Sequence, residues 1–376
     1  MNFAFDEDQK SLAHTVGQQL ADFPALVAPD LTPPHNDAVW RALTDLGLFA
    51  LLVPERHEGV GLSLVDLALA VEALGAGLAP PAIVATLAAT DAIVRHGSEA
   101  QQRILLPRIA RGALKVAIAF LEAEIGYDAA AVRTALSAGM LQGEKILVAD
   151  AADADMFLVI AKIANVPTLI LVERTNAGVT VRPHDDLDPT SGHCAITFDD
   201  VVVGADAILG HAAPARAVER LLDVSATLHS GLLIGIASRM FAAAVDYAKT
   251  RVQFGQPIGA FQAIKHRCAD MAVSLEAGRS AAYYAFWAAA EDAPDRARAA
   301  SMAKAYCGEV ARNVCNEAVQ VHGGMGFTWE LGLHRFLRRS RVIEHAFGDA
   351  VWHNERIVAA TLAEMNGLAS LDKNAA

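Results

Sequence analysis

The sequence predicts a mainly α-helical protein with a small β domain at its centre. Apolar residues recur at helical spacing from about residue 6 to 115 and again after residue 216, and short β-rich runs separated by polar turns lie between them. With 376 residues, the chain also exceeds the length that one hydrophobic core usually organises. We therefore expect an N-terminal helical domain over residues 1–115, a small antiparallel sheet or barrel over 116–209 and a C-terminal four-helix bundle over 210–376.

The clearest break in the N-terminal part is the run VPERHEGVG at residues 53–61. It is too rich in Gly and Pro to be the interior of a helix, and it stands between two apolar helical stretches. We expect a loop there.

Five short runs in the middle part have the composition of β-strands, namely residues 145–148, 156–160, 168–172, 179–182 and 194–198. No long helix fits between most of them, which favours antiparallel pairing over a doubly wound parallel sheet. The stretch also lacks a GxGxxG motif after a strand, so the sequence does not support a Rossmann-type dinucleotide site.

The C-terminal part divides into three or four helices of about 25 to 35 residues, because FGQP at 254–257, the pair Ala293-Pro294 and the pair Gly323-Gly324 each interrupt the helical pattern. Long helices with short joints predict a bundle. A stripe at a spacing of four, expected to face the bundle core, consists of Leu228, Leu232, Ile236 and Met240.

Composition excludes several classes of protein. Hydrophobic residues make up 53% of the chain, but charged or polar residues break every long apolar stretch, so we expect no membrane span. The N-terminus, MNFAFDED, lacks the basic and apolar regions of a secretory signal, and we expect a cytoplasmic protein. The net charge of −12 disfavours nucleic acid, and the basic run HRFLRRSR at 334–341 is interpreted as a solvated or salt-bridged helix face.

The four cysteines are far apart and form no CxxC pair, which argues against a disulfide framework and against a metal site. We expect all four to be buried thiols: Cys194, Cys268, Cys307 and Cys315.

Several motifs resemble those of the acyl-CoA dehydrogenase family, and the order of the three domains is that of the family from end to end. The stretch from Trp40 to Gly61 is similar to "LGL…VPEE-GG-G", and LEAEIGYD at 121–128 stands where the family has "TEPxAGSD". The run RVQFGQPIGAFQ at 251–262 is a close match to "RxQFGxPIxxFQ", and QVHGGMG at 320–326 accompanies it at a second helix boundary.

This resemblance implies FAD as cofactor and an acyl-CoA thioester as substrate. The residues that it assigns to FAD binding are Arg251, Phe254, Gln262, Gln320, Gly323 and Gly324. Their chemistry agrees, because a guanidinium can grip a phosphate with two hydrogen bonds and a Gly-Gly pair lets backbone approach a ligand closely. In the family these positions reach the FAD of a neighbouring subunit, so the resemblance also implies an oligomer. A purely structural alternative is that Gly323-Gly324 ends a helix and Arg251 faces a helix dipole.

The sequence departs from the family where the catalytic base is expected. The family reaction removes the α-hydrogen as a proton and passes the β-hydrogen to the flavin as hydride, and a glutamate at one of two positions takes the proton. Aligning RRSRVI at 338–343 with the family's "RDAKIY" places Phe347 at one position, and counting back from Phe254 places Ser225 at the other. Neither side chain is a useful base.

Three residues could replace the missing glutamate. Asp349 lies two residues after Phe347, Glu344 lies about one helical turn before it, and His229 lies one turn after Ser225 on the same helix face. Each also has a structural explanation: a cap for Asp349, an ion pair with Arg341 or Arg338 for Glu344, and a satisfied core histidine for His229.

The flavin contacts that the family makes within one chain are also reduced. Leu147 stands where an aromatic residue covers the ring, Ala149 where a threonine donates near N5, and Leu121 at the threonine of "TEP". Backbone donors could still hold a flavin.

We therefore interpret the chain as an acyl-CoA dehydrogenase-like flavoprotein subunit of a hetero-oligomer, whose partner supplies the base and most of the flavin bed. Partner subunits of this kind act on sterol side chains or other bulky acyl-CoA esters in relatives, and electron-transferring flavoprotein is the usual electron acceptor. One alternative is a self-sufficient homo-oligomer with a displaced base. A second alternative is a helical interaction protein that has lost its cofactor. The sequence does not identify the acyl chain.

Overall fold

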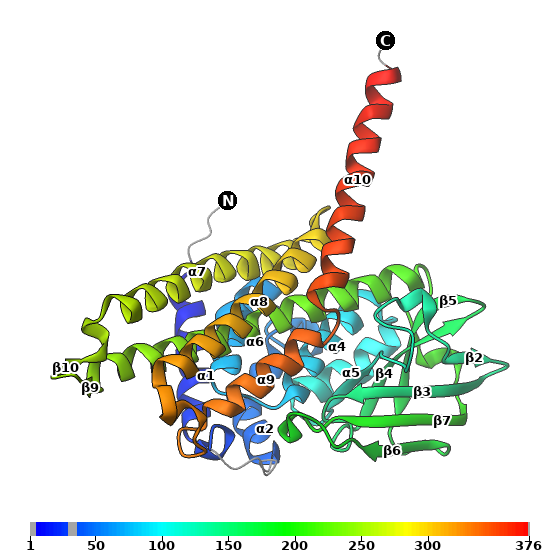
Figure 1. Cartoon of the computed structure of the whole chain (residues 1–376). Helices are drawn as coiled ribbons and strands as arrows, with labels where there is room; N and C mark the ends of the chain where they lie inside the picture. The colour runs from blue at the N-terminus through cyan, green and yellow to red at the C-terminus, as the bar shows by residue number, and fades with distance from the viewer. Residues whose placement is uncertain (1–4, 29–35, 375–376) are drawn as a thin grey trace.

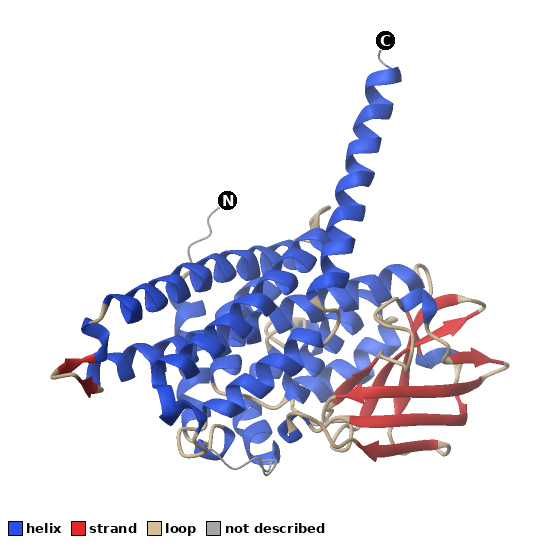
Figure 2. Ribbon diagram, viewed as in Figure 1, coloured by secondary structure: helices blue, strands red, loops and turns tan. Residues whose placement is uncertain are grey.

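The structure, a computed structural model, describes residues 5–28 and 36–374. Residues 1–4, the first part of the N-terminal stretch without a signal pattern, lie outside the described residues. The chain forms three consecutive regions: a helical N-terminal region, an eight-stranded sheet in the middle of the sequence and a C-terminal helical bundle. Figures 1 and 2 show the large sheet on one side of the helices. The predicted fold class is confirmed.

The N-terminal region packs five helices against the bundle: α1 (Glu7–Ala21), α2 (Asn36–Asp45), α3 (Ala68–Ala76), α4 (Pro81–His96) and α5 (Glu99–Ala110). Capping boxes at Asp6 and Ser98 start α1 and α5, where each side chain accepts a hydrogen bond from the N3 backbone and the N3 glutamine accepts one in return from the cap backbone. The expected loop at 53–61 is a series of turns with one short 3₁₀ segment, Glu55–His57.

Eight strands form the central sheet: β1 (Val116–Ala119), β2 (Ala135–Ser137), β3 (Met140–Val148), β4 (Met156–Ile163), β5 (Val166–Glu173), β6 (Val179–Pro183), β7 (Cys194–Val202) and β8 (Ile208–Leu209). Their order is β6-β7-β3-β2-β4-β5-β8, and β1 pairs with β4. Antiparallel pairing dominates as expected, but β1 and β2 each pair with β4 in parallel. Strand β1 was not among the predicted strands, since its four residues are apolar and fully buried and so lack an alternating pattern.

The C-terminal region contains α6 (Pro214–Thr250), α7 (Gln262–Ala290), α8 (Arg296–His322), α9 (Leu333–His345) and α10 (Ala350–Asn374). Helices α6, α7, α8 and α9 pack together, and α10 extends away from the body (Figure 1). A small hairpin of β9 (Val252–Gln253) and β10 (Gln256–Pro257) joins α6 to α7. The stripe predicted to face the core is buried, because Leu228, Leu232, Ile236 and Met240 are at most 7% exposed.

Among the residues that the structure describes, one helix, α6, is long and apolar enough to cross a membrane. In its most apolar stretch 61% is buried inside the molecule. Burial of this kind is typical of a helix at the core of a globular protein.

One minor expectation is wrong and another holds only in part. Cys268 is only partly buried, whereas the other three cysteines are buried. The basic run at 334–341 was expected to be a solvated or salt-bridged face: it is salt-bridged, through Arg339 to Asp188 and Arg341 to Glu344, but it is not solvated throughout, because Arg335 and Arg339 are 2% and 4% exposed. Arg339 forms an ion pair with Asp188 and donates hydrogen bonds to the backbone oxygens of Ala79 (3.1 Å) and Thr190 (2.9 Å). The arginine therefore fastens α9 to the N-terminal region and to the loop before β7.

Candidate active site and cofactor site

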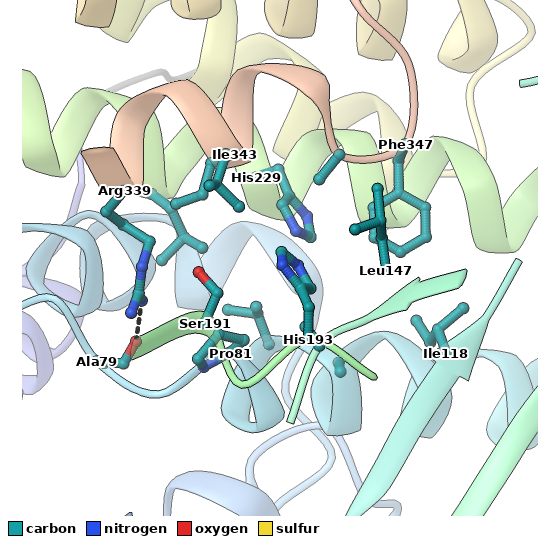
Figure 3. A pocket seen from close by; sticks show the side chains of 16 residues that line it. Ala79, Pro81, Ile118, Leu147, Ser191, His193, His229, Arg339, Ile343 and Phe347 are labelled. Carbon is teal, nitrogen blue, oxygen red and sulfur yellow. Dashed lines mark hydrogen bonds between the residues drawn. The ribbon is translucent and has the colours of Figure 1, made fainter. Parts of the chain in front are cut away.

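An inner pocket lies where the sheet meets α4, α6 and α9 (Figure 3). Its volume is about 80 Å³, and its walls are mainly aliphatic, including Ile118, Leu147, Leu232 and Ile343. For comparison, a cavity of about 150 Å³ holds a single benzene ring. The inner pocket as it stands is therefore too small for the three fused rings of a flavin.

A wider outer pocket of about 430 Å³ continues from the inner one, and the two share the lining residues Leu147, His193, Val342 and Ala346. Its lining includes the side chains of Tyr127, Asp185, Asp186, Arg341 and His345. This outer pocket has room for a ring system. The three aliphatic replacements identified in the sequence all line these pockets: Leu121 the outer one, Ala149 the inner one, and Leu147 both.

Phe347, the residue that the sequence resemblance aligns with a family glutamate, occupies a wall of the inner pocket. Its φ of 57° is uncommon for a bulky residue, and its ring lies against that of His229, with ring centroids 4.9 Å apart. The segment is held by Lys304, whose buried ammonium donates to the backbone oxygens of Glu344 (2.8 Å) and Gly348 (2.9 Å). Burial lowers the pKa of Lys304 to about 7, although the nearby carboxylates of Glu344 and Asp349 oppose this.

The next residue of this segment, Gly348, has a φ of 114°, and a Cβ there would come within 2.6 Å of both Trp352 and His353. Only glycine fits this turn without a shift of the two rings.

The structure separates the three candidate bases. Only His229 lines the pocket. Glu344 is 5% exposed and pairs with Arg312 at 3.0 Å and with Arg341. The Oδ1 atom of Asp349 accepts a hydrogen bond from the backbone N–H of Trp352 at 2.9 Å, as an N-cap does. Glu344 is therefore part of an ion pair and Asp349 is a helix cap, as their structural explanations predicted.

His229 is held by its Nδ1 atom, which lies 2.7 Å from the backbone oxygen of Ser225. Since a carbonyl oxygen only accepts, Nδ1 carries the hydrogen and Nε2 keeps a lone pair. Burial, together with the positive charge of Lys304, lowers the pKa of His229 to about 4, although the hydrogen bond to Ser225 opposes this. The hydroxyl oxygen of Ser225 is buried, has no hydrogen-bond partner within residues 5–28 and 36–374, and does not line either pocket.

His193, which lines both pockets, was not predicted from the sequence. It follows Gly192 directly before β7, and its Nδ1 atom is hydrogen-bonded to Oδ2 of Asp186. The segment HDDLDPTSGH at 184–193 could have indicated it, because two histidines and three aspartates stand in one short loop beside a strand.

The residues that the resemblance assigns to FAD lie elsewhere, at the far end of the bundle. Arg251 ends α6, Gln262 begins α7, and Gln320 lies in the last turn of α8 before Gly323 and Gly324. The ends of α6 and α8 are brought together by Tyr247 and His322, whose rings stack. We define the bundle-end site as the six residues Arg251, Phe254, Gln262, Gln320, Gly323 and Gly324.

The bundle-end site is open to solvent. Phe254 is 93% exposed at the turn of the β9–β10 hairpin, with a φ of 54°. A Cβ added at Gly323 or Gly324 would meet no atom of the described part of the chain within 4 Å. Gly323, with a φ of 58°, also ends α8. Its role at the helix end is therefore compatible with a role in binding. The exposed Arg251 side chain has no ion-pair or hydrogen-bond partner among the residues that the structure describes.

The bundle-end site and the inner pocket are separate. Arg251 follows His229 by 22 positions along α6, which at 1.5 Å per residue puts their backbones about 33 Å apart. Within one chain, the bundle-end site and the inner pocket are therefore too far apart to bind the same part of a ligand. Among the described residues, no group of three or more His, Cys, Asp or Glu side chains is placed to hold a metal ion.

Comparison with known proteins identifies the family. Three family models match in succession: acyl-CoA dehydrogenase N-terminal domain at residues 6–113, middle domain at 117–201 and C-terminal domain at 215–362. The chain belongs to the acyl-CoA dehydrogenase family. These enzymes are oxidoreductases that depend on FAD.

One curated relative is the probable acyl-CoA dehydrogenase YngJ of Bacillus subtilis, which is 31% identical over 96% of this chain and 99% of its own length. Two solved structures are also similar. The ChsE4-ChsE5 complex from Mycobacterium tuberculosis has a TM-score of 0.87 and 25% identity, over 97% of this chain and 99% of that one. An acyl-CoA dehydrogenase complexed with FAD from Bacillus anthracis has a TM-score of 0.88 and 25% identity, over 96% and 68%.

Proposed function

We propose that this chain is one subunit of a hetero-oligomeric acyl-CoA dehydrogenase and that it lends its bundle-end site to the FAD of a partner subunit of the same fold. The observation that carries the proposal is the contrast between the two sites. The bundle-end site keeps the family's residues in an exposed, unobstructed arrangement. The chain's own pocket has Phe347 in place of the glutamate and aliphatic side chains in place of flavin contacts.

The partner contributes the glutamate and most of the flavin bed in this proposal. FAD, when bound, accepts the hydride that leaves the β-carbon of the acyl-CoA. Arg251 gives its guanidinium to the pyrophosphate, Gln320 offers an amide, and Gly323-Gly324 allows backbone to approach the cofactor. The similar structure from Mycobacterium tuberculosis is that of a complex, ChsE4-ChsE5, which supports an assembly of unlike subunits here. Electron-transferring flavoprotein is the proposed electron acceptor.

The experiment compares this chain alone with a mixed complex. The partner is an acyl-CoA dehydrogenase-like chain that carries the glutamate, sought first in the neighbouring gene. We expect flavin absorbance and acyl-CoA oxidation in the complex and little of either from this chain alone. In the complex, Arg251→Ala should weaken FAD binding, since a hydrogen bond to a charged group contributes about 1.5–3 kcal/mol.

Arg251→Lys is the matched control, because it keeps the charge but loses the two-pronged geometry, and it should weaken binding less. Full FAD occupancy of this chain as a monomer, or unchanged FAD affinity in the Arg251→Ala complex, would count against the proposal. A complex without any flavin absorbance would favour the interaction-protein alternative.

A self-sufficient homo-oligomer is the second candidate. The observation that favours it is the presence of two imidazoles, those of His193 and His229, in the wall of the inner pocket. Full dehydrogenase activity of the purified chain alone would select it.

A further inference from the structure

Two histidines face each other across the inner pocket. His229 reaches in from α6, and His193 reaches in from the loop before β7, with the two rings directed toward one another (Figure 3). Each ring is held at its Nδ1 atom, His229 by the backbone of Ser225 and His193 by the carboxylate of Asp186. In both rings Nε2 is therefore the nitrogen left to face a ligand.

Asp186 is itself fixed. Its Oδ1 atom accepts a hydrogen bond from the backbone N–H of Asp188 at 2.6 Å, while its Oδ2 atom bonds His193. The side chains of His193 and Asp186 are each only 10% exposed. A carboxylate on Nδ1 holds the tautomer whose Nε2 has a free lone pair, and it stabilises the imidazolium that forms when Nε2 takes a proton.

The two histidines differ in what they can do. The ring of His229 is held by a neutral carbonyl, with the charge of Lys304 nearby, so that proton uptake by its Nε2 atom is unfavourable. The ring of His193 is held by the carboxylate of Asp186, which fixes the tautomer that has a free lone pair on Nε2. Of the pair, His193 is also the one that lines both pockets, so it is the better placed to act on a bound ligand.

We propose that His193 is a catalytic base in this chain's own pocket and removes the α-proton of a bound acyl thioester, with Asp186 as its positioning residue. In this step the α-carbon–hydrogen bond breaks and an Nε2–H bond forms on His193. The electron pair of the broken bond moves toward the thioester oxygen as an enolate. Return of a proton from His193, after exchange with water, restores the thioester.

The position of His193 at the junction of the two pockets suits this role. The aliphatic inner pocket can take a short acyl chain, and the wider outer pocket beside it includes Tyr127 and Arg341 in its lining. A thioester at the junction would place its α-carbon beside the imidazole. The inference concerns the chain's own pocket and does not depend on the bundle-end site or on the partner's glutamate.

The test measures proton exchange, which requires no change in the oxidation state of the substrate. The full-length chain is incubated with butyryl-CoA in D₂O, and deuterium at the α-carbon is measured by mass spectrometry. If the chain is unstable alone, the mixed complex is used with the partner's glutamate replaced by glutamine. We expect exchange by the wild-type chain and a loss of about 10²–10⁴-fold in His193→Gln, the usual contribution of a general base.

His184→Gln is the matched control, because His184 is an exposed residue of the same loop and should leave exchange unchanged. If His193→Gln disturbs folding, His193→Ala with added imidazole replaces it, and imidazole should restore part of the exchange. Absence of exchange by the wild-type chain, or exchange undiminished in the His193 variants, would overturn the proposal. Neither result would affect FAD binding through Arg251, so failure here is distinguishable from failure of the proposed function.

The role of Asp186 is tested through the tautomer of His193. In Asp186→Asn the amide can donate to Nδ1, which would move the ring hydrogen to Nε2 and remove the lone pair that faces the pocket. We expect ¹⁵N NMR of the histidine rings to report this change and exchange to fall by at least about 10²-fold. Asp186→Glu, which keeps a carboxylate, should retain more of the proton exchange than Asp186→Asn. Unchanged ring nitrogen shifts in Asp186→Asn would contradict the positioning role.

Discussion

The rings of Tyr247 and His322 stack with their centroids 4.4 Å apart, and this contact joins the end of α6 to the end of α8. The Nδ1 atom of His322 lies 2.7 Å from the backbone oxygen of Ala318, which fixes its ring. Arg251 lies four residues after Tyr247, and Gly323 follows His322 directly. The stacked pair therefore sets the spacing between the two segments that we propose to hold a partner's FAD.

Replacing Tyr247 by leucine should weaken FAD binding in the mixed complex although Arg251 is still present. An aromatic pair contributes about 0.5–1.5 kcal/mol beyond its buried area, so a loss of a few-fold in affinity is expected from misplacement of the two helix ends. Fluorescence titration of the apo-complex with FAD measures it. Tyr247→Phe keeps the stacking and is the control, and equal affinities for the two variants would contradict this account.

The ion pair between Arg339 and Asp188 makes stability depend on pH in the acid range. Burial raises the pKa of Asp188, but Arg339 and the hydrogen bonds from Thr190 and Ser191 outweigh burial and lower it to about 2, from 3.8 in the unfolded chain. Because the folded pKa is lower, the stabilisation is complete above pH 3.8 and is lost as pH falls through 2. The shift corresponds to roughly 2 kcal/mol.

Arg339→Met should therefore destabilise the protein by about 3–5 kcal/mol at neutral pH, because it leaves the Asp188 carboxylate buried without its partner. Urea unfolding at pH 7 measures this. The double variant Arg339→Met/Asp188→Asn removes the unpaired charge and should recover part of the loss. A single variant as stable as the wild type would show that the pair does not fasten α9 to the loop before β7.

His229 should make the protein sensitive to acid in a higher pH range. Its pKa is about 4 in the folded chain against 6.5 for the free side chain, so the unfolded chain binds a proton at pH values where the folded chain does not. This contribution is present above pH 6.5 and is lost as pH falls toward 4, at most about 2 kcal/mol between pH 7 and pH 5. In His229→Gln that part of the pH dependence should disappear, which urea unfolding at both pH values can measure.

His353 is a second contributor to the same pH dependence of stability. Burial lowers its pKa to about 2, so its contribution is lost in an overlapping pH range. His353→Gln should reduce the same slope independently, and the two effects should add if the sites do not interact. An unaltered slope in His229→Gln would mean that His229 takes up a proton as readily in the folded chain as in the unfolded chain.

The fold could be predicted from the sequence because its long elements carry strong patterns. The bundle core stripe that includes Leu228 and Met240 repeats over several helical turns, and the strand runs alternate with turn residues. Strand β1 escaped recognition, since Val116 to Ala119 form an entirely buried run without alternation. The parallel pairing of β1 with β4 depends on contacts distant in sequence, which a local pattern does not contain.

The candidate site was predicted unevenly for a similar reason. Arg251 and Gly323 belong to contiguous motifs, so the sequence pointed to them directly. His193 and His229 come together only through the folding of a loop onto α6, and nothing in residues 194–228, which separate them, indicates the contact. The buried state of Arg339 was missed because its partner, Asp188, lies 151 positions away in sequence.

A carboxylate introduced at position 347 tests whether the chain's own pocket can bind FAD and oxidise an acyl-CoA. Phe347→Glu places the carboxylate in the wall of the inner pocket beside His229, where removal of the phenyl ring also enlarges a space of about 80 Å³. We expect dehydrogenase activity of the chain alone to rise, by up to about 10²–10⁴-fold, only if the variant also retains FAD, because the base and the hydride acceptor must lie on opposite sides of the substrate. Flavin absorbance and acyl-CoA oxidation are measured together.

Phe347→Gln enlarges the pocket equally without adding a base and is the matched control. Ser225→Glu should behave differently, because Ser225 is 1% exposed and does not line either pocket, so the new carboxylate would be buried without a partner and should destabilise the fold. If Phe347→Glu retains FAD without any gain in oxidation, the pocket binds the cofactor but does not bring the substrate's α-carbon to that wall. If wild-type protein alone is already fully active and Asp349→Asn abolishes that activity with FAD retained, Asp349 is the base and the hetero-oligomer proposal is wrong.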